Sequence, residues 1–276
     1  MSSPSISVIL STFNSPWHLS RALCGYSLQQ VRPVEIVIAD DGSDDSTRGV
    51  VERWAKQLPV VHVWQVHDGF RKCAILNKAV AAAKGDYLIF SDGDCIPEPE
   101  FVAVHAAAAT KGQFLSGGAI RLPKKATEQI GFAEIADGRI FTSEWLRDNH
   151  VSWRERLKLK RRTPWQPVLN SLSPTRPTFN GNNSSAWRAD VVAVNGFDER
   201  MVYGGLDRDL GERLERIHVF GCSIRYVATV VHLDHPRSYR SEAGVAANLR
   251  IRRENAARKT SWTPHGLAGK SKMAPV

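Results

Sequence analysis

The sequence of 276 residues has few cysteines and no long apolar segment. Its four cysteines lie far apart and form no C-x-x-C pair, which argues against a zinc site or a redox dithiol and predicts reduced thiols in the core: Cys24, Cys73, Cys95 and Cys222. No run of 18 apolar residues offers a transmembrane helix, and the N-terminus lacks the basic and apolar regions of a secretory signal. We therefore expect a cytosolic protein.

Positive charge is in excess, with a formal net charge of +9, and much of it lies in residues 153–165 and 250–272. Such clusters can contact nucleic acid, an anionic membrane or an acidic substrate, although a solvated basic face is the commonest explanation. The clusters lack the interleaved aromatic residues of an RNA-binding sheet, so we expect no nucleic-acid partner. Trp153 and Trp165 lie within the first cluster and suggest peripheral contact with the inner face of the cell membrane.

Apolar runs typical of strands alternate with helical patterns through the first 110 residues. The strand patterns cover 5–14, 34–40, 60–66 and 86–92, and the helical patterns cover 17–30, 44–58, 70–84 and 99–110. This alternation predicts an α/β fold with a mostly parallel central sheet flanked by helices. Strands that are apolar almost throughout fit such a sheet, because both of its faces are buried.

The alternation ends near residue 122. A longer helical stretch is predicted over 127–148, a loop rich in proline and arginine over 158–177, a helix from Asp207 to about Ile217 and a strand over 223–233. We divide the chain into a nucleotide-binding half (1–122), an acceptor-binding and catalytic half of the same domain (123–240), and a basic C-terminal helix and tail (241–276).

Polar residues follow three of the predicted strands, at Ser11–Asn14, Asp40–Ser43 and Asp92–Asp94. Ligands bind at the carboxyl ends of parallel strands, so these residues are expected to share one edge of the sheet. Carboxylates gathered there repel one another unless a cation or a ligand rich in donors lies among them. Mg²⁺ or Mn²⁺ together with a phosphate-bearing substrate would relieve this repulsion. The "DGD" segment taken alone, however, also occurs in ordinary surface turns.

The segments "SVILSTFN", "VEIVIADDGSDDST" and "AILNKAVAAAKGDYLIFSDGDCIPEPEFV" resemble the family 2 glycosyltransferases of the GT-A fold. The later segments "FNGNNSSAWRADVVAVNGFDE" and "YGGLDRDLGERL" are similar to the C-terminal region of galactosyltransferase-type enzymes. The resemblance spans most of residues 5–235. It implies metal-dependent, inverting transfer of a hexose from a nucleotide diphosphate sugar, with UDP favoured, to a hydroxyl of a glycan or glycolipid in lipopolysaccharide or other cell-surface polysaccharide synthesis.

The resemblance also assigns roles to residues of the first half. It places the nucleoside at Ser11, Phe13 and Asp41, with Asp41 accepting the imide N–H of uracil and Phe13 against the base. Arg71 and Lys72 face the ribose or diphosphate, unless they are a solvated pair. Asp92 and Asp94 match the DxD motif, with Asp94 as a direct ligand of Mn²⁺ or Mg²⁺ and Asp92 also near the ribose. His232 is expected as a further ligand in preference to His235, although a histidine after an apolar run is more often structural.

In the second half, the resemblance makes Asp207 the catalytic base, although an aspartate there can equally be a helix N-cap. Leu206 stands where the family commonly has Glu, which leaves the acceptor contacts open, and Asp209 is a partial substitute. The donor-sugar or acceptor pocket is expected to include Asn180, Asn182, Asn183, Trp187 and Gly205. A nucleotidyltransferase is the main alternative, but "LSTFNSPWHLSR" is not the glycine- and lysine-rich phosphate loop with which such enzymes begin.

Overall fold

The computed structural model describes residues 3–159, 176–236 and 239–268. Strands and helices alternate through the first 108 residues, as predicted. In order, this part contains β1 (Ile6–Thr12), α1 (Pro16–Ser27), β2 (Glu35–Asp40), α2 (Asp45–Ala55), β3 (Val60–Trp64), α3 (Lys72–Ala82), β4 (Tyr87–Asp92), β5 (Cys95–Pro97) and α4 (Phe101–Ala108).

The rest of the chain contains shorter elements. They are β6 (Gln113–Ser116), β7 (Gly118–Arg121), α5 (Lys124–Glu128), α6 (Phe132–Ala136), the 3-10 helix η1 (Arg139–Phe141), α7 (Ser143–Asp148), α8 (Trp153–Arg156), β8 (Ser184–Trp187), α10 (Arg188–Ala193), α11 (Leu206–Arg216), β9 (Phe220–Ser223), β10 (Thr229–His232) and α12 (Glu242–Ala257).

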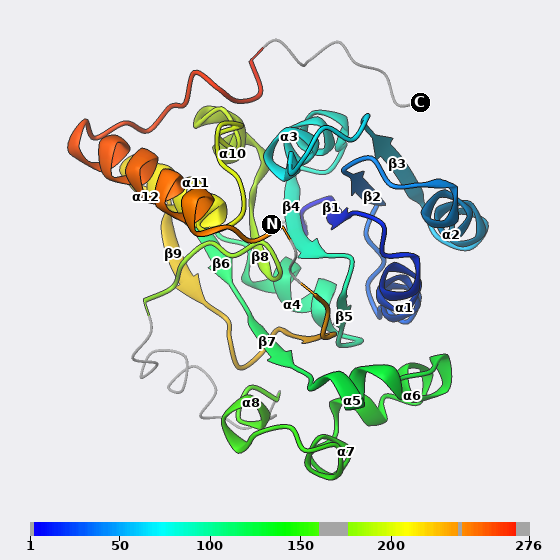
Figure 1. The fold of residues 1–276 in the computed structure, drawn as a ribbon. Helices are drawn as coiled ribbons and strands as arrows, with labels where there is room; N and C mark the ends of the chain where they lie inside the picture. The colour runs from blue at the N-terminus through cyan, green and yellow to red at the C-terminus, as the bar shows by residue number, and fades with distance from the viewer. Residues whose placement is uncertain (1–2, 160–175, 237–238, 269–276) are drawn as a thin grey trace.

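A seven-stranded sheet in the order β3-β2-β1-β4-β8-β6-β9 forms the centre of the molecule (Figure 1). β3, β2, β1 and β4 are parallel, β8 runs antiparallel to both β4 and β6, and β9 is parallel to β6. The predicted α/β fold with a mostly parallel sheet is confirmed. Because β8 lies between β4 and β6, strands from both halves of the chain form one sheet.

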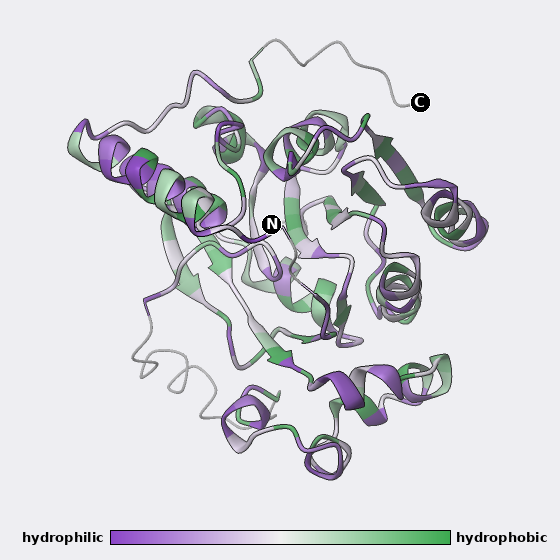
Figure 2. Cartoon of the chain, in the orientation of Figure 1, coloured by the Kyte–Doolittle hydropathy of each residue, from purple (hydrophilic) through white to green (hydrophobic). Residues whose placement is uncertain are grey.

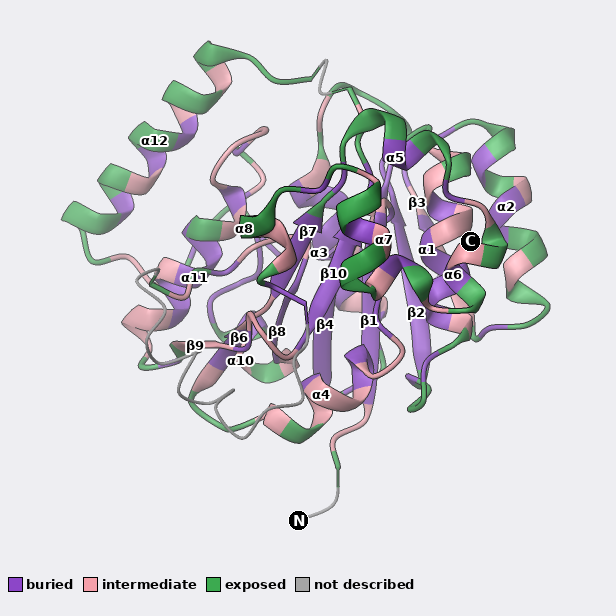
Figure 3. Ribbon diagram, turned by 90° about the horizontal axis from the view of Figure 1, so that it is seen from below, coloured by how far each residue is buried: buried purple, intermediate pink, exposed green. Residues whose placement is uncertain are grey.

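The sheet is buried on both faces, and consecutive residues of β1 pack on opposite sides of it. Val8 and Leu10 belong to a core cluster that includes residues of α1, α2 and α4. Ile9 belongs to the other large cluster, which includes residues of α3, α10 and α11. Apolar residues therefore fill the strands without polar alternation, as expected for central parallel strands. Figures 2 and 3 show the strands as hydrophobic and buried, with the hydrophilic, exposed residues gathered on the helices.

The prediction of one continuous helix over 127–148 is wrong. The structure breaks this stretch into α5, α6, η1 and α7, which pack with the three-stranded sheet β5-β10-β7. Two glycines explain the breaks, since Gly131 is extended at the start of α6 and Gly138 takes a left-handed φ of 74° before η1. The apolar spacing is real, because Ile135, Ile140 and Leu146 are buried.

The predicted strand over 223–233 is two strands in different sheets. β9 ends at Ser223 and β10 begins at Thr229, and a turn between them is closed by the Val227 amide donating to the Ile224 carbonyl at 3.1 Å. The predicted helix near Asp207 is confirmed as α11, and a helix beyond Arg240 is confirmed as α12. Residues 160–175, which make up most of the predicted loop, lie outside the described residues.

All four cysteines are free thiols, as predicted, and Cys24, Cys73 and Cys95 are buried. Within the described ranges, no helix is both long enough and apolar enough to span a bilayer.

Candidate active site

The carboxyl ends of β2, β1 and β4 lie at one edge of the sheet, as the sequence predicted. Ser11 of β1 is level with Ala39 of β2 on one side and with Asp92 of β4 on the other. A cavity of about 960 Å³ opens at this edge. Residues from both halves of the chain line it, including Ser11, Phe13, Asp41, Lys72, Asp92, Asp94, Asn180, Asn182, Gly205, Leu206, Asp207, His232 and His235.

Asp92 lies at the centre of this group and is held by two donors. The Ser11 hydroxyl donates to Asp92 Oδ1 at 2.7 Å, and Lys72 Nζ donates to the same oxygen at 2.6 Å. Burial alone would lower the pKa of the Lys72 ammonium, but Asp92 and Asp207 raise it above its ordinary value. Lys72 is therefore a fixed positive charge between two carboxylates.

Asp94 faces two histidines rather than the single one that the sequence favoured. His235 Nε2 lies 2.9 Å from Asp94 Oδ2, and His232 Nε2 lies 3.8 Å from Asp94 Oδ1. Burial would raise the pKa of Asp94, but the two imidazoles hold it well below its usual range. Ligand atoms of all three side chains lie within 4.8 Å of one another, and carboxylate and imidazole are ordinary ligands of divalent cations. These residues therefore fit a metal ion.

Asp207 lies in the first turn of α11, after two glycines with left-handed backbones. Gly204 has a φ of 104° and Gly205 a φ of 86°, which side-chain-bearing residues rarely adopt. A Cβ at Gly181 would lie 2.9 Å from Asp207 Oδ1, so a larger residue at this position would push the carboxylate out of its place. Burial raises the pKa of Asp207 to about 6, and Oδ1 has no hydrogen-bond partner within the described residues.

Asn248 of α12 holds the loop that leads into Asp207. Its Nδ2 donates to the carbonyls of Val202 and Gly204, both at 2.7 Å, and its Oδ1 accepts the Val202 N–H at 3.1 Å. Asn248 is 1% exposed. The C-terminal helix thus fixes the position of the residue predicted as the base.

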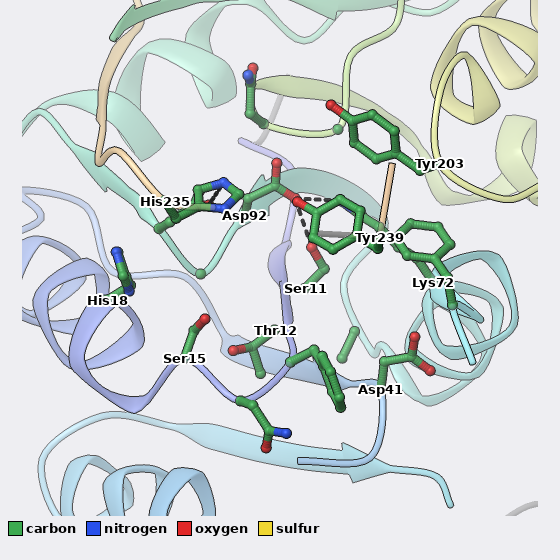
Figure 4. Close-up of a pocket in the computed structure, with 18 of the residues that line it drawn as sticks. Ser11, Thr12, Ser15, His18, Asp41, Lys72, Asp92, Tyr203, His235 and Tyr239 are labelled. Atoms are coloured by element: carbon green, nitrogen blue, oxygen red, sulfur yellow. Dashed lines mark hydrogen bonds and ion pairs between the residues drawn. The ribbon is translucent and has the colours of Figure 1, made fainter. Parts of the chain in front are cut away.

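Asp41 lies at the other end of the cavity from His235 (Figure 4). Its Oδ1 accepts from Gln65 Nε2 at 2.6 Å and its Oδ2 from the Arg71 N–H at 2.9 Å. Burial raises the pKa of Asp41 despite these two donors. The ring of Phe13, which is 39% exposed, stacks on His67 with centroids 4.3 Å apart. A flat, partly exposed aromatic face beside a carboxylate suits a nucleobase.

Four predicted residues do not present their side chains to the cavity. Asn183 is fully buried and bonds to His105 and to the carbonyls of Gly118 and Ala228. Trp187 packs against Tyr87 and carries the Lys111 ammonium over its ring. Arg71 contributes its backbone N–H to Asp41, while its guanidinium lies 3.7 Å from Asp68 on the surface.

Asp209 is the fourth of these residues, and it is part of a buried cluster. It pairs with Arg213 at 2.7 Å and accepts from Asn255 Nδ2 at 2.8 Å, and Arg213 also donates to the carbonyls of Val194 and Gly196. On a helix, residues two positions apart point in different directions, so Asp209 turns into the core while Asp207 faces the cavity. Leu206 lines the cavity but is only 4% exposed, because it also packs in the core.

The sequence prediction missed an aromatic wall beside Asp207. Tyr203 and Tyr239 have ring centroids 5.0 Å apart, and Phe70 lies 5.3 Å from Tyr239 and 6.2 Å from Tyr203. The three rings line the cavity from three separate segments (Figure 4 labels Tyr203 and Tyr239). Isolated aromatic residues in loops carry no periodic signal, so their meeting is visible only in three dimensions.

The raised pKa of Asp207 predicts a pH dependence of stability. The carboxyl titrates near 3.8 when unfolded and near 6 when folded, so its contribution is complete below about pH 4 and is lost as the pH rises through 6. We expect Asp207→Asn, which stays neutral, to gain roughly 1–3 kcal/mol of unfolding free energy relative to wild type between pH 4 and 7.5. Urea unfolding in EDTA at both pH values measures this difference.

The matched control is Asp68→Asn, whose carboxylate is 84% exposed and should show no such change between the two pH values. A difference between wild type and Asp207→Asn that is the same at pH 4 and pH 7.5 would contradict the burial of a titrating carboxyl at this position.

Two solved structures have the same fold as this chain. The mannosyltransferase PcManGT from Pyrobaculum calidifontis, in complex with GDP-Man and Mn²⁺, aligns with a TM-score of 0.60 and 20% identity over 96% of this chain and 67% of that one. Glucosyl-3-phosphoglycerate synthase from Mycobacterium tuberculosis, in complex with Mn²⁺, UDP and glucosyl-3-phosphoglycerate, aligns with a TM-score of 0.54 and 20% identity over 90% and 80% of the two chains. The fold is therefore GT-A.

Among sequence relatives, validoxylamine A glucosyltransferase of Streptomyces hygroscopicus subsp. limoneus is 28% identical over 257 residues. The match covers 88% of this chain but only 54% of that protein, so the chain spans about half of the relative's length. Residues 7–169, more than half of the chain, match the sequence profile "Glycosyl transferase family 2". The chain thus belongs to glycosyl transferase family 2.

Proposed function

We propose that the protein transfers a hexose from a nucleotide diphosphate sugar, with UDP preferred, to a hydroxyl of a glycan or glycolipid, with inversion at the anomeric carbon. One observation carries this proposal. Asp207, whose pKa burial raises to about 6 and whose Oδ1 has no hydrogen-bond partner among the described residues, lines the cavity that also holds Lys72, Asp92 and the group around Asp94. A base is thereby available in the same cavity as groups suited to a diphosphate.

The nucleoside is proposed to bind between β1 and β2, with the base against Phe13 and its N–H toward Asp41. GDP-Man in one structural neighbour and UDP in another support a nucleotide donor but leave both nucleosides as candidates. We favour UDP on the sequence resemblance, because the chain has the residues that family 2 enzymes place around uracil. The ribose and diphosphate then lie toward Asp92 and Lys72.

The chemistry that we propose for the chain's own residues is a single displacement. Asp207 removes the proton from the acceptor hydroxyl as that oxygen attacks the anomeric carbon, and a base on the side opposite the leaving group gives inversion. Lys72 lies where negative charge grows on the departing diphosphate, which it stabilises. Asp94 and the nearby histidines would hold a divalent cation, with Asp92 as a further ligand. The cation would neutralise more of the negative charge on the diphosphate.

The acceptor is proposed to bind at the wall formed by Phe70, Tyr203 and Tyr239, next to Gly205 and Leu206. Aromatic faces pack against the C–H faces of sugar rings, and Asn180 and Asn182 can answer sugar hydroxyls. Leu206 stands where the family commonly has Glu and has no carboxylate. The acceptor hydroxyls are therefore proposed to bind to other side chains. We propose a role for the product in cell-surface polysaccharide synthesis on the sequence resemblance alone.

We also propose that the basic surface reaches an anionic membrane that carries the acceptor. The support is the net charge of +9 and Trp153, which is 61% exposed on α8, while Trp165 lies outside the described residues. Tryptophan and basic residues together favour anionic lipid surfaces. Co-sedimentation with vesicles that does not increase with their anionic lipid content would count against this contact.

The donor site is tested with Asp94→Asn. We expect UDP-hexoses to raise the melting temperature of the wild type in the presence of Mn²⁺, because a ligand at 100 times its Kd stabilises by about 2.7 kcal/mol. Asp94→Asn should lose this shift, while Asp68→Asn should keep it. The measurement is a thermal-shift panel of UDP-glucose, UDP-galactose and GDP-mannose with and without Mn²⁺, and an equal shift in Asp94→Asn would remove Asp94 from the donor site.

The base is tested with Asp207→Asn. Loss of a general base should reduce the rate of UDP release from UDP-hexose by about 10² or more, while donor binding stays close to that of the wild type. Arg208→Ala, which changes the exposed neighbour on the same helix, is the matched control. UDP release by Asp207→Asn at the wild-type rate would exclude Asp207 as the base.

A further inference from the structure

We infer that His105 is a positioning residue, which acts through a buried hydrogen-bond network on the loop of the cavity that faces Asp207. This loop, called here the asparagine loop, consists of Asn180, Gly181 and Asn182, all of which line the cavity. His105 itself is fully buried on α4, so its effect must pass through other residues. The inference rests on the proposed function, because Asp207 is the base assigned there.

Four polar side chains meet in the core around His105. Tyr87 of β4, Ser185 of β8, His105 and Asn183 are each 0% exposed. Tyr87 Oη lies 2.9 Å from Ser185 Oγ, which in turn lies 2.7 Å from His105 Nδ1. His105 Nε2 lies 3.1 Å from Asn183 Oδ1. The side chains therefore form one continuous network that leads from α4 to the residue directly after the asparagine loop.

The hydrogen bonds of this network have a fixed direction. Asn183 Nδ2 donates to the carbonyls of Gly118 at 2.8 Å and Ala228 at 3.0 Å, so Asn183 Oδ1 is the acceptor that faces the imidazole. His105 Nε2 must then carry the proton. Burial lowers the pKa of His105 to about 4, so the ring is neutral at pH 7 and its Nδ1 accepts from the Ser185 hydroxyl. The imidazole fixes the Asn183 amide on one side and the two carbonyls fix it on the other.

The backbone of Asn183 connects this network to the asparagine loop. Its N–H donates to Asn180 Oδ1 at 2.8 Å, and its carbonyl accepts the Gly117 N–H at 2.9 Å. The Asn180 N–H donates to Ser184 Oγ at 2.8 Å. Hydrogen bonds therefore close the loop around Gly181 and tie it to the residue that His105 orients.

Two glycines show how closely the network and the base approach this loop. A Cβ at Gly117 would lie 2.1 Å from Asn183 Oδ1, and a Cβ at Gly181 would lie 2.9 Å from Asp207 Oδ1. A loop that moved toward α11 would collide with the carboxylate, and one that moved away would open the space that now buries it. A misplacement of about 1 Å in a reacting group can lower a rate by about 10². The position of the asparagine loop therefore matters for the proposed base.

The test compares His105→Leu, which has no hydrogen-bonding group, with His105→Gln, which keeps a donor for Asn183. Leucine leaves the buried Asn183 and Ser185 groups without their partner, and this loss favours a new position of the loop. If His105→Leu does not fold, Ser185→Ala replaces it, because it removes the donor to Nδ1. Circular dichroism melting shows which variants are folded.

Phe101→Leu is the matched control. Phe101 is fully buried on α4, and its ring packs on His105 with centroids 4.6 Å apart. This variant loosens the same part of the core and leaves every donor and acceptor of the network in place.

Hydrogen exchange of the full chain, followed by mass spectrometry without nucleotide or metal, measures the loop directly. The measured quantity is the exchange rate of residues 178–187 relative to that of residues 242–257 in α12. We expect this ratio to rise about 10-fold in His105→Leu, because amides whose acceptors move lose protection. The ratio in His105→Gln should be closer to that of the wild type than to that of His105→Leu, and the ratio in Phe101→Leu should equal that of the wild type.

The effect on the reaction is measured as UDP release from UDP-hexose with Mn²⁺. We expect kcat in His105→Leu to fall by about 10-fold or more, while the KM for the donor and the thermal shift on donor binding stay close to those of the wild type. A residue that only stabilised the core would not separate kcat from KM in this way. Phe101→Leu should keep the wild-type kcat.

The inference would be overturned by a wild-type exchange ratio in folded His105→Leu or Ser185→Ala, or by equal ratios in His105→Leu and His105→Gln. An equal rise in Phe101→Leu, or wild-type kcat in folded His105→Leu, would also end it, and the latter would leave the transferase proposal intact. The proposed function fails separately. If the wild type released no UDP from any sugar nucleotide with any cation, while the exchange ratio still depended on His105, the network would stand and the transferase proposal would end.

Discussion

The mutual repulsion of three carboxylates within one cavity is the constraint on which the site depends. Asp92 and Asp94 are one residue apart at the end of β4, and Asp207 arrives from α11. Lys72 donates to Asp92 and also interacts electrostatically with Asp207, and two histidines face Asp94, so each acid has a positive or polarisable neighbour. These neighbours offset the repulsion between the carboxylates. Asp207 nevertheless keeps a pKa raised to about 6, and its Oδ1 has no hydrogen-bond partner among the described residues.

This balance depends on the register of the sheet. Ser11 is level with Asp92 because β1 and β4 are parallel and in register, and its hydroxyl reaches the carboxylate directly. The antiparallel β8 then brings the segment with Gly181 and Asn182 to the same edge, where Gly181 makes room for Asp207. A shift of one residue in either pairing would turn these side chains to the opposite face.

The first half of the fold could be predicted from the sequence because each strand and helix carries its own periodic signal. The polar ends of β1, β2 and β4 were also predictable, since parallel strands end at the same edge. The breaks at Gly131 and Gly138 were missed because the apolar spacing continues through them, and residues in separate short helices can keep one face buried. Asn183 and Asp209 were expected in the pocket because sequence gives residue type but not the direction of a side chain.

The sequence offered both His232 and His235 as ligands and favoured His232, but that both face Asp94, and that an aromatic wall forms, could not be predicted for a related reason. His235, Tyr203 and Tyr239 lie in loops, where spacing indicates no common face, and Phe70 lies more than a hundred residues earlier in the chain. His232, at the end of a strand pattern, had the stronger local signal of the two histidines. Loop residues of this kind are held by contacts between distant segments, which a single sequence does not reveal.

The hydrogen bonds of the Asn248 side chain limit where this chain can be truncated. The family profile ends at residue 169, whereas the side chain that sets the loop before Asp207 belongs to the last helix of the described chain. A version that ended before Glu242 would retain every acid of the cavity and still lose the hydrogen bonds that hold the loop before Asp207. Exchange of this C-terminal segment would therefore disturb the loop before Asp207 without altering Asp41, Lys72 or Asp92.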